Sequence, residues 1–215
     1  MKRRDGDTGG KLLQSIDNLK KGNLKKLVDA RIKEFKEIDR RSCEEIFQEL
    51  CFCILTANFN AEKCIKIQKE IGNGFLTLSE DELAKKLVKL GHRFPNTRAK
   101  YISESQKYLD NLTCMISSLH REELRSWFIN NIKGLGYKEA SHFLRNIGFD
   151  DYAIIDFHIV DILVRHNITK RPKTLSKRRY LEVEDLLKEI AIKSDLNLAE
   201  LDLYLWYLET GKILK

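Results

Sequence analysis

The chain is poor in proline and has no long apolar run. Of its 215 residues only 2 are proline, Pro95 and Pro172, so helices can continue without the interruption that proline imposes. No stretch of about 18 apolar residues occurs, which argues against a membrane-spanning helix. The opening residues Met1 to Gly6 lack the apolar core of a secretion signal. We therefore expect a cytoplasmic, monomeric protein without a membrane partner.

Cysteine is scarce and badly placed for a metal cluster. No cysteine follows Cys114, which excludes a four-cysteine iron–sulfur cluster near the C-terminus. The pair Cys51 and Cys53 lacks the spacing of zinc ligands. We expect Cys51, Cys53 and Cys64 to be reduced core residues, and the protein to need no metal or other cofactor.

The charge balance favours a polyanionic partner. The 39 Lys+Arg residues outnumber the 32 Asp+Glu residues, which gives a net charge of +7 and a pI near 9.1. A lysine-rich surface or the charged surface of a thermophilic protein gives the same balance. The charge therefore does not identify the partner by itself.

Apolar residues recur at helical spacing along most of the chain. Strand signals are nearly absent, because Ala153–Ile155 is too short to indicate a sheet. Ser42, with Glu45 three residues later, predicts a capping box at a helix start. The sequence thus predicts an all-α fold, with helices over 47–55, 64–71 (stopped by Gly72), 83–90 (Gly91), 99–109, 124–132, 140–147 (Gly148), 159–163, 181–192 and 198–208. Residues 1–10 are predicted to be disordered, and the basic segment 170–179 to be a loop that binds a nucleic-acid backbone or is simply solvated.

A glycine-centred turn, Gly134-Leu135-Gly136, separates two of these helices. The backbone amides of such a turn and of the next helix's first turn lack intrahelical partners, and the positive end of the helix dipole lies there. Glycine also allows close approach of an anion. The turn therefore predicts a phosphate site that reads no bases, although an ordinary helix–turn–helix corner has the same pattern.

The helix after this turn carries a basic face. Lys138, His142 and Arg145 lie at i, i+4 and i+7, opposite the apolar residues of the same helix. Lys138 is in the first turn, where the dipole disfavours an added proton, and an uncharged lysine amine is a nucleophile. Either a solvated basic stripe or a catalytic face lining a cleft fits this pattern.

Asp156 precedes a further helix pattern and is a candidate N-cap. A capping carboxylate that is held by backbone amides stays ionised and fixed in direction, so it can also stabilise a positive sugar in a transition state. His158 follows in the first turn and is either a phosphate ligand or a surface histidine.

These motifs resemble those of the helix-hairpin-helix DNA glycosylase superfamily, and within it most closely the archaeal 8-oxoguanine DNA glycosylase/lyases. The segments that carry the resemblance are 132–140, 155–159, 50–58, 90–94, 138–146, 201–206 and 211–215. The resemblance implies one functional unit over 11–215 with two helical lobes, about 43–131 and 11–42 plus 132–215. It also implies that duplex DNA containing 8-oxoguanine is the partner and that the damaged nucleotide is flipped out of the helix.

The resemblance further implies a role for each site residue. Lys138 attacks C1′ of the sugar, forms a Schiff base and allows β-elimination, and Asp156 supports the cationic sugar. For the damaged base it implies stacking on Phe94 and Trp206, a pocket position for His142, and recognition of the N7–H by the carboxylate of Lys215.

The remaining implied contacts involve the opposite strand and the backbone. Asn58 fills the vacated stack and meets the orphaned cytosine, and Arg98 helps to read that cytosine. Gly134, Gly136 and His158 contact phosphates. Phe157 departs from the polar residue that this family's motif would place between Asp156 and His158, which puts the local phosphate contacts in question.

Two other functions remain open from the sequence. A helix-hairpin-helix glycosylase for oxidised pyrimidines, of the endonuclease III type, is weakened by the missing cysteine cluster. A non-catalytic DNA-binding module would use Lys138 only to contact phosphate. A purely hydrolytic glycosylase is disfavoured because it would give Lys138 no catalytic role.

Overall fold

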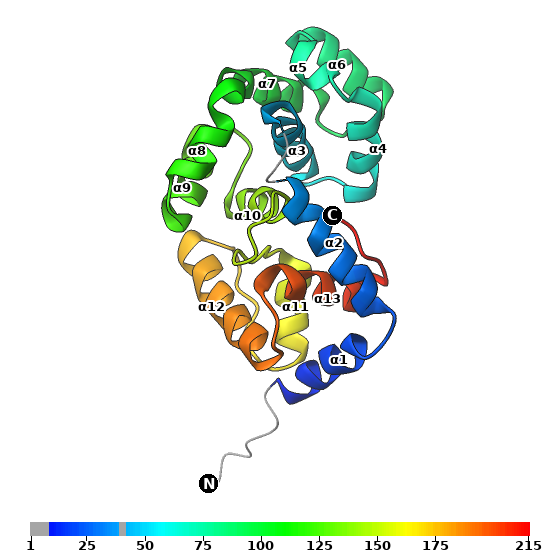
Figure 1. The fold of residues 1–215 in the computed structure, drawn as a ribbon, viewed down its shortest axis with the longest axis vertical. Coiled ribbons are helices and arrows are strands. Elements are labelled where there is room, and N and C mark those ends of the chain that lie inside the picture. The colour runs from blue at the N-terminus through cyan, green and yellow to red at the C-terminus, as the bar shows by residue number, and fades with distance from the viewer. Residues whose placement is uncertain (1–8, 39–41) are drawn as a thin grey trace. The chain divides into compact units, whose positions relative to one another are not determined.

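A computed structural model describes residues 9–38 and 42–215 of the protein (Figure 1). All regular elements within these ranges are helices, which confirms the predicted all-α fold. The chain divides into two compact units. One, unit 1, contains the described residues up to Glu34 together with Phe149–Lys215, and the other, unit 2, is Phe35–Gly148.

Unit 2 is built around one apolar helix, α3 (Cys43–Thr56), whose residues from Phe47 onward are buried apart from the partly exposed Gln48. Its apolar side chains point in all directions, so it needs cover on every side. The elements around it contact α3 directly or pack on those that do. They are α4 (Ala61–Ile71), α5 (Gly74–Thr77), α6 (Glu80–Lys89), α7 (Pro95–Ser105), the 3-10 helix η1 (Gln106–Asn111), α8 (Leu112–Ser118), α9 (Arg121–Asn131) and α10 (Tyr137–Asn146).

Several predicted helix ends are confirmed in this unit. Ser42 Oγ accepts a hydrogen bond from Glu45 N at 3.4 Å, and Ser42 N donates to Glu45 Oε2 at 3.2 Å, which completes the capping box. Gly72 caps the end of α4 with a positive φ of 51°. Gly91, with φ of 73°, follows the end of α6.

One predicted helix is split. The sequence predicted a single helix over 99–109, whereas α7 ends at Ser105 and η1 continues in 3-10 geometry. Ser105 Oγ donates to the carbonyl of Tyr101 at 2.7 Å, a side-chain bond that competes with the α-helical pattern. The shorter α5 and α8 had no separate signal in the sequence.

Unit 1 is organised around α13 (Leu198–Thr210), which contacts α1 (Gly10–Lys20), α11 (Phe157–Arg165) and α12 (Lys177–Lys193). Helix α2 (Leu24–Ile38) begins in this unit and ends in unit 2. The buried side chains of α13 include Leu198, Leu201 and Leu205. No helix in the described part of the chain combines the length and apolar character needed to cross a membrane.

The structure corrects two expectations in unit 1. Residues 1–8 of the predicted disordered segment lie outside the described residues, but Gly10 begins α1, and Leu13 N donates to Gly9 O at 3.0 Å. The predicted loop 170–179 ends at Ser176, whose hydroxyl caps α12 by accepting from Arg179 N at 3.4 Å. Residues 177–179 are therefore the first turn of a helix.

The division into units also runs differently from the lobes that the resemblance implied. Those lobes placed 132–215 together, whereas the glycine turn and α10 belong to unit 2. The physical reason is a buried contact between α10 and α3. Asn146 Nδ2 donates to Glu49 Oε1 at 2.6 Å, and both residues are inaccessible or nearly so.

Candidate active site

The glycine turn has the geometry of an anion site. Gly134 has φ of 88°, and a Cβ added to it would lie 2.6 Å from Cδ2 of Tyr101, so only glycine fits. Gly136 N donates to Glu139 Oε2 at 3.3 Å. The first hydrogen bond of α10 runs from Ala140 N to Gly136 O at 3.0 Å. The amides of residues 137–139 thus precede the helical bonding pattern, as phosphate binding requires.

Lys138 lies in the first turn of α10, directly after this turn. Its side chain is 30% exposed, and its Nζ is 3.9 Å from Glu139 Oε1. Burial raises the pKa of the Cys64 thiol to about 12, while the positive charges of Arg98 and Lys138 act in the opposite direction. Cys64 therefore stays protonated near neutral pH and adds no negative charge beside the amine.

The rest of the basic face of α10 is internal. His142 is 7% exposed and packs edge-on against Phe52, with ring centroids 5.6 Å apart. Arg145 is 3% exposed, and its guanidinium carbon lies 4.6 Å from the centre of the Phe35 ring. The basic face of α10 is thus not a solvated stripe. It does not line an open cleft over its whole length either, because His142 and Arg145 are buried. Of these three residues only Lys138 reaches the surface.

Asn58 and Arg98 are joined through the backbone. Asn58 is exposed and has a left-handed backbone with φ of 58°, which asparagine tolerates better than most residues. Arg98 is 7% exposed, and its Nη2 donates to the carbonyl of Ala57 at 2.6 Å. The guanidinium also lies over the rings of Phe94 and Tyr101, at 5.7 and 5.8 Å from their centres. Its Nε is buried without a partner among the described residues.

Phe94 is held by a histidine. Its N–H donates to His92 Nδ1 at 3.1 Å, and His92 Nε2 lies 3.0 Å from the carbonyl of Leu55. A carbonyl only accepts, so Nε2 carries the proton and the ring is neutral. Burial lowers the pKa of His92, and the nearby charge of Arg98 lowers it further, while the bond to Leu55 acts the other way. Pro95 then starts α7 at its first position.

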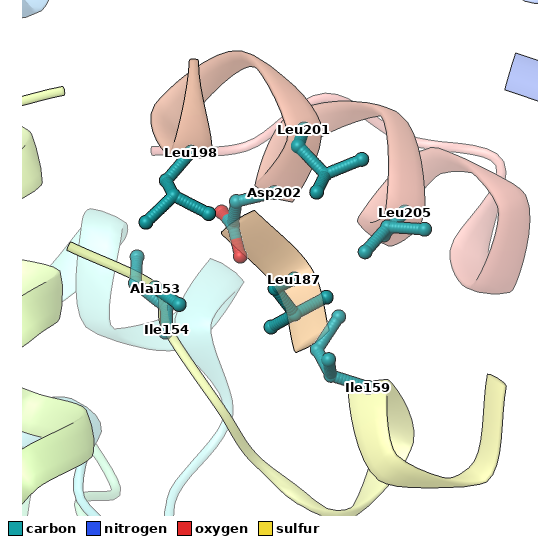
Figure 2. Close-up of a pocket in the computed structure, with 8 residues that line it drawn as sticks. All are labelled: Ala153, Ile154, Ile159, Leu187, Leu198, Leu201, Asp202 and Leu205. Carbon is teal, nitrogen blue, oxygen red and sulfur yellow. The ribbon is translucent and has the colours of Figure 1, made fainter. Parts of the chain in front are cut away.

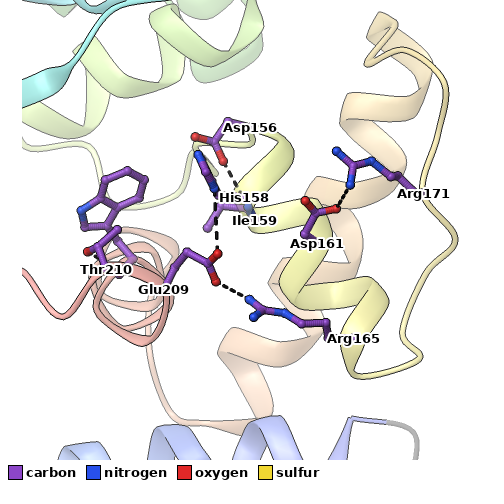
Figure 3. A network of polar contacts seen from close by, with 9 residues as sticks. Asp156, His158, Ile159, Asp161, Arg165, Arg171, Glu209 and Thr210 are labelled. Carbon is purple, nitrogen blue, oxygen red and sulfur yellow. Dashed lines mark hydrogen bonds and ion pairs between the residues drawn. The ribbon is translucent and has the colours of Figure 1, made fainter.

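Asp156 caps α11, as predicted. Its Oδ1 accepts from Ile159 N at 3.1 Å (Figure 3). The extended segment before it is fixed by Tyr180, whose hydroxyl accepts from Ile155 N at 3.1 Å and donates to Ala153 O at 2.6 Å. The carboxylate therefore stands at the end of a rigidly bonded segment.

His158 and Trp206 are neighbours in unit 1. Their rings are perpendicular with centroids 6.2 Å apart, and His158 Nδ1 lies 3.9 Å from Glu209 Oε1 (Figure 3). Glu209 also pairs with Arg165. Trp206 is partly exposed, and its indole Nε1 is buried without an acceptor in the described part of the chain. Such an unpaired donor is the kind of group that a bound base can satisfy.

The C-terminal segment leaves α13 at Gly211, which has φ of 70°. Lys212 N donates to Thr210 Oγ1 at 3.3 Å. Lys215 is only partly exposed, so it is not a fully solvated tail residue.

A small pocket beside the Asp156 segment does not belong to the site. Its lining is aliphatic apart from the carboxylate of Asp202, and it offers no ring on which a base could stack (Figure 2). The lining residues are Ala153, Ile154, Ile159, Leu187, Leu198, Leu201, Asp202 and Leu205. We assign this pocket to the packing of α13 on the extended segment.

The predicted site residues thus fall into two groups. Unit 2 contains Asn58, Phe94, Arg98, Gly134, Gly136, Lys138 and His142, and unit 1 contains Asp156, His158, Trp206 and Lys215. Within the described ranges, no three His, Cys, Asp or Glu side chains are grouped as metal ligands would be.

Four supporting residues were missed by the sequence reasoning. Tyr101 could have been found, because it lies one helical turn after Arg98. His92 lies within the segment 90–94 but was not singled out. Tyr180 and Glu209 had no local signal, because each acts on a residue far away in the chain.

Comparison with known proteins identifies the family. The family model described as 8-oxoguanine DNA glycosylase matches residues 28–196 of the chain. The chain belongs to this family. The resemblance inferred from the hairpin and aspartate motifs is thereby confirmed.

Individual members of the family match over nearly the whole chain. A Methanocaldococcus jannaschii protein named 8-oxoguanine DNA glycosylase/AP lyase is 54% identical over 206 residues, which cover 95% of this chain and 99% of that protein. A Korarchaeum cryptofilum protein of the same name is 51% identical, with coverage of 95% and 98%.

Solved structures of the family agree in fold. The Methanocaldococcus jannaschii glycosylase/lyase in complex with a 15mer DNA containing 8-oxoguanine superposes with a TM-score of 0.92 at 53% identity, covering 95% of this chain and 100% of that one. The 8-oxoguanine DNA glycosylase of Thermotoga maritima gives a TM-score of 0.90 at 43% identity, with coverage of 96% and 99%.

Proposed function

We propose that this protein excises 8-oxoguanine from duplex DNA and then cuts the strand at the resulting site. The observation that carries the proposal is the position of Lys138. A partly exposed lysine stands in the first turn of α10, directly after a glycine turn with the geometry of a phosphate site. Membership of the 8-oxoguanine DNA glycosylase family favours a catalytic role for this amine over the phosphate contact that a binding module would make with it.

The chemistry requires an uncharged lysine amine. Lys138 Nζ attacks C1′ of the flipped nucleotide, the bond from C1′ to the base breaks, and the base leaves with a proton. The amine gives up one proton to the departing base. As the sugar ring opens, the ring oxygen takes up a proton from solvent and the nitrogen keeps its second hydrogen, which gives a protonated Schiff base. Removal of a proton from C2′ then expels the 3′ phosphate and breaks the strand. Asp156, oriented by its hydrogen bond from Ile159 N, stabilises the positive charge on the sugar.

Recognition of the base is assigned to the aromatic residues and the C-terminal segment. Phe94 and Trp206 stack on the purine. 8-Oxoguanine carries a hydrogen on N7, where guanine has a bare acceptor. The terminal carboxylate of Lys215 accepts that hydrogen, and His142 of α10 is assigned a contact with the damaged base.

The remaining contacts position the duplex. Backbone amides at Gly134 and Gly136, together with His158, hold phosphates. Asn58 fills the gap left by the flipped base, and its exposure and left-handed backbone support this role. Arg98 contributes to reading the orphaned cytosine. We also propose that the protein acts inside the cell, where its DNA substrate is found.

Borohydride trapping tests the proposal. The wild-type protein should form a covalent adduct with a duplex containing 8-oxoguanine, and Lys138→Gln should form none while still binding the duplex. Lys133→Gln is the matched control. Lys133 is an exposed lysine next to Gly134 in the glycine turn, and it forms an ion pair with Glu104. Tight binding without any wild-type adduct would favour the non-catalytic module. Adducts formed only with oxidised pyrimidines would favour the endonuclease III type.

A further inference from the structure

One short stretch of unit 1 carries a concentrated positive charge. Residues 162–181 contain Arg165, Lys170, Arg171, Lys173, Lys177, Arg178 and Arg179 and no aspartate or glutamate. This charge of +7 equals the net charge of the entire chain, so the other 195 residues (215 − 20) balance to zero.

Six of these cations are exposed and lie within ten residues of one another in the sequence, and we call them the basic surface: Lys170, Arg171, Lys173, Lys177, Arg178 and Arg179. Arg178 and Arg179 share one carboxylate, that of Glu182. Lys170 and Lys173 have no carboxylate partner among the described residues. The surface therefore carries far more positive charge than its neighbours neutralise.

Part of this charge opposes the stability of its own helix. Residues 177–179 form the first turn of α12, where the helix dipole is positive, and no acidic residue is present there. Cations at a helix N-terminus are unfavourable, so the arrangement has no benefit for folding. An anion bound at this turn would reverse the effect, because both the side chains and the dipole would attract it.

The loop that carries the surface is tied to the aspartate motif. Arg171 Nη1 donates to Asp161 Oδ1 at 2.6 Å (Figure 3). The guanidinium carbon of Arg171 also lies 5.3 Å from the centre of the Phe157 ring. Phe157 directly follows Asp156 and is 40% exposed. The basic surface thus begins at a residue that contacts the helix capped by Asp156.

We propose that the basic surface binds the phosphates of duplex DNA flanking the lesion and supplies much of the protein's sequence-independent affinity. The proposal rests on the proposed function for its location beside the helix that Asp156 caps, but it concerns a separate contact with the duplex. Arg171, whose guanidinium lies over the Phe157 ring, ties the basic surface to the helix that follows Asp156. Binding releases counterions from the duplex, so the contact is recognised by its salt dependence.

The test compares two triple variants of equal net charge. Lys170→Gln/Lys173→Gln/Lys177→Gln removes half of the basic surface and leaves Arg171 on Phe157. The control is Lys85→Gln/Lys89→Gln/Lys193→Gln, whose lysines are exposed on helices that also carry carboxylates. The affinity of each for an undamaged duplex is measured over a range of salt concentrations.

In the first variant, the slope of log affinity against log salt concentration should become shallower by roughly 0.9 for each phosphate that is no longer neutralised. In the control variant the slope should stay at the wild-type value. Equal slopes in both variants would overturn the proposal. A second pair, Lys173→Glu and Lys193→Glu, changes one loop residue and one helix-end residue. Lys173→Glu should weaken duplex binding several-fold more, and equal weakening would also overturn the proposal.

Failure of the proposed function gives a different result. In that case the wild-type protein forms no borohydride adduct with 8-oxoguanine DNA, whatever the salt slope. If the basic surface is right and the chemistry is right, the Lys170/Lys173/Lys177 variant should still form the adduct at low salt and saturating protein concentration.

Discussion

Arg98 Nη2 donates a hydrogen bond to the carbonyl of Ala57, 2.6 Å away, and so fixes the residue that precedes Asn58. The guanidinium is buried between the rings of Phe94 and Tyr101, and Tyr101 in turn lies against Gly134. One arginine thus links the Asn58 turn, the aromatic residue Phe94 and the glycine turn.

This link predicts coupling between Arg98 and Asn58. Arg98→Met should lower the free energy of unfolding by about 1–3 kcal/mol, because the Ala57 carbonyl loses its donor. It should also lower the preference for cytosine opposite the lesion, as should Asn58→Ala. If Arg98 acts through the turn, the double variant should have nearly the preference of Asn58→Ala alone. Fully additive effects in a double-mutant cycle would instead indicate that Arg98 reads cytosine directly.

Gly134→Ala should damage the phosphate-binding turn. The left-handed backbone costs a non-glycine residue about 1–2 kcal/mol, and the clash with Tyr101 adds roughly 1–3 kcal/mol. Gly91→Ala is the matched control, because its φ is also positive but its Cβ meets nothing within 4 Å. Urea unfolding and duplex affinity measure the difference. Adding Tyr101→Ala to Gly134→Ala should recover part of the stability, and no recovery would argue against the clash.

Substitutions at Asp156 should separate capping from catalysis. Asparagine caps helices about as well as aspartate, so Asp156→Asn should unfold like the wild type. It lacks the charge, so single-turnover base excision should slow by on the order of a hundredfold or more. Asp156→Ala should slow base excision in the same way, and it should also lower the free energy of unfolding by about 1 kcal/mol because the cap is lost. A fully active Asp156→Asn would remove the carboxylate from the mechanism.

Stability should fall on acidification because of His92. Burial lowers its pKa in the folded protein, so the unfolded chain binds more protons between that lowered value and the ordinary value of about 6.5. Unfolding free energy should therefore be greatest above pH 6.5 and decrease as the pH falls below it. Protonation of Nδ1 would also set two donors against each other, the ring N–H and Phe94 N–H.

Denaturant unfolding of His92→Gln at several pH values checks this prediction. The unfolding free energy of the variant should depend less steeply on pH than that of the wild type. Some dependence should remain, because burial and nearby cations also lower the pKa of His166. An identical pH dependence in both proteins would exclude His92 as the cause.

The sequence by itself determined many of the helices and several of their caps. The Ser42 capping box, the glycine stops at Gly72 and Gly91 and the N-cap at Asp156 are all local signals, in which residues within one helical turn act on each other. Such signals can be recognised in a single sequence, because the spacing along the chain alone determines which residues interact. The same holds for the glycine turn followed by Lys138.

Only the tertiary structure decided which side chains support these motifs. The basic face of α10 was expected at a surface or a cleft, but His142 and Arg145 pack against Phe52 and Phe35. Arg98 reaches a carbonyl 41 residues away, and Tyr180 reaches one 27 residues away. Spacing along the chain cannot identify such pairs, because they form only where packing of the apolar helix faces brings distant segments into contact.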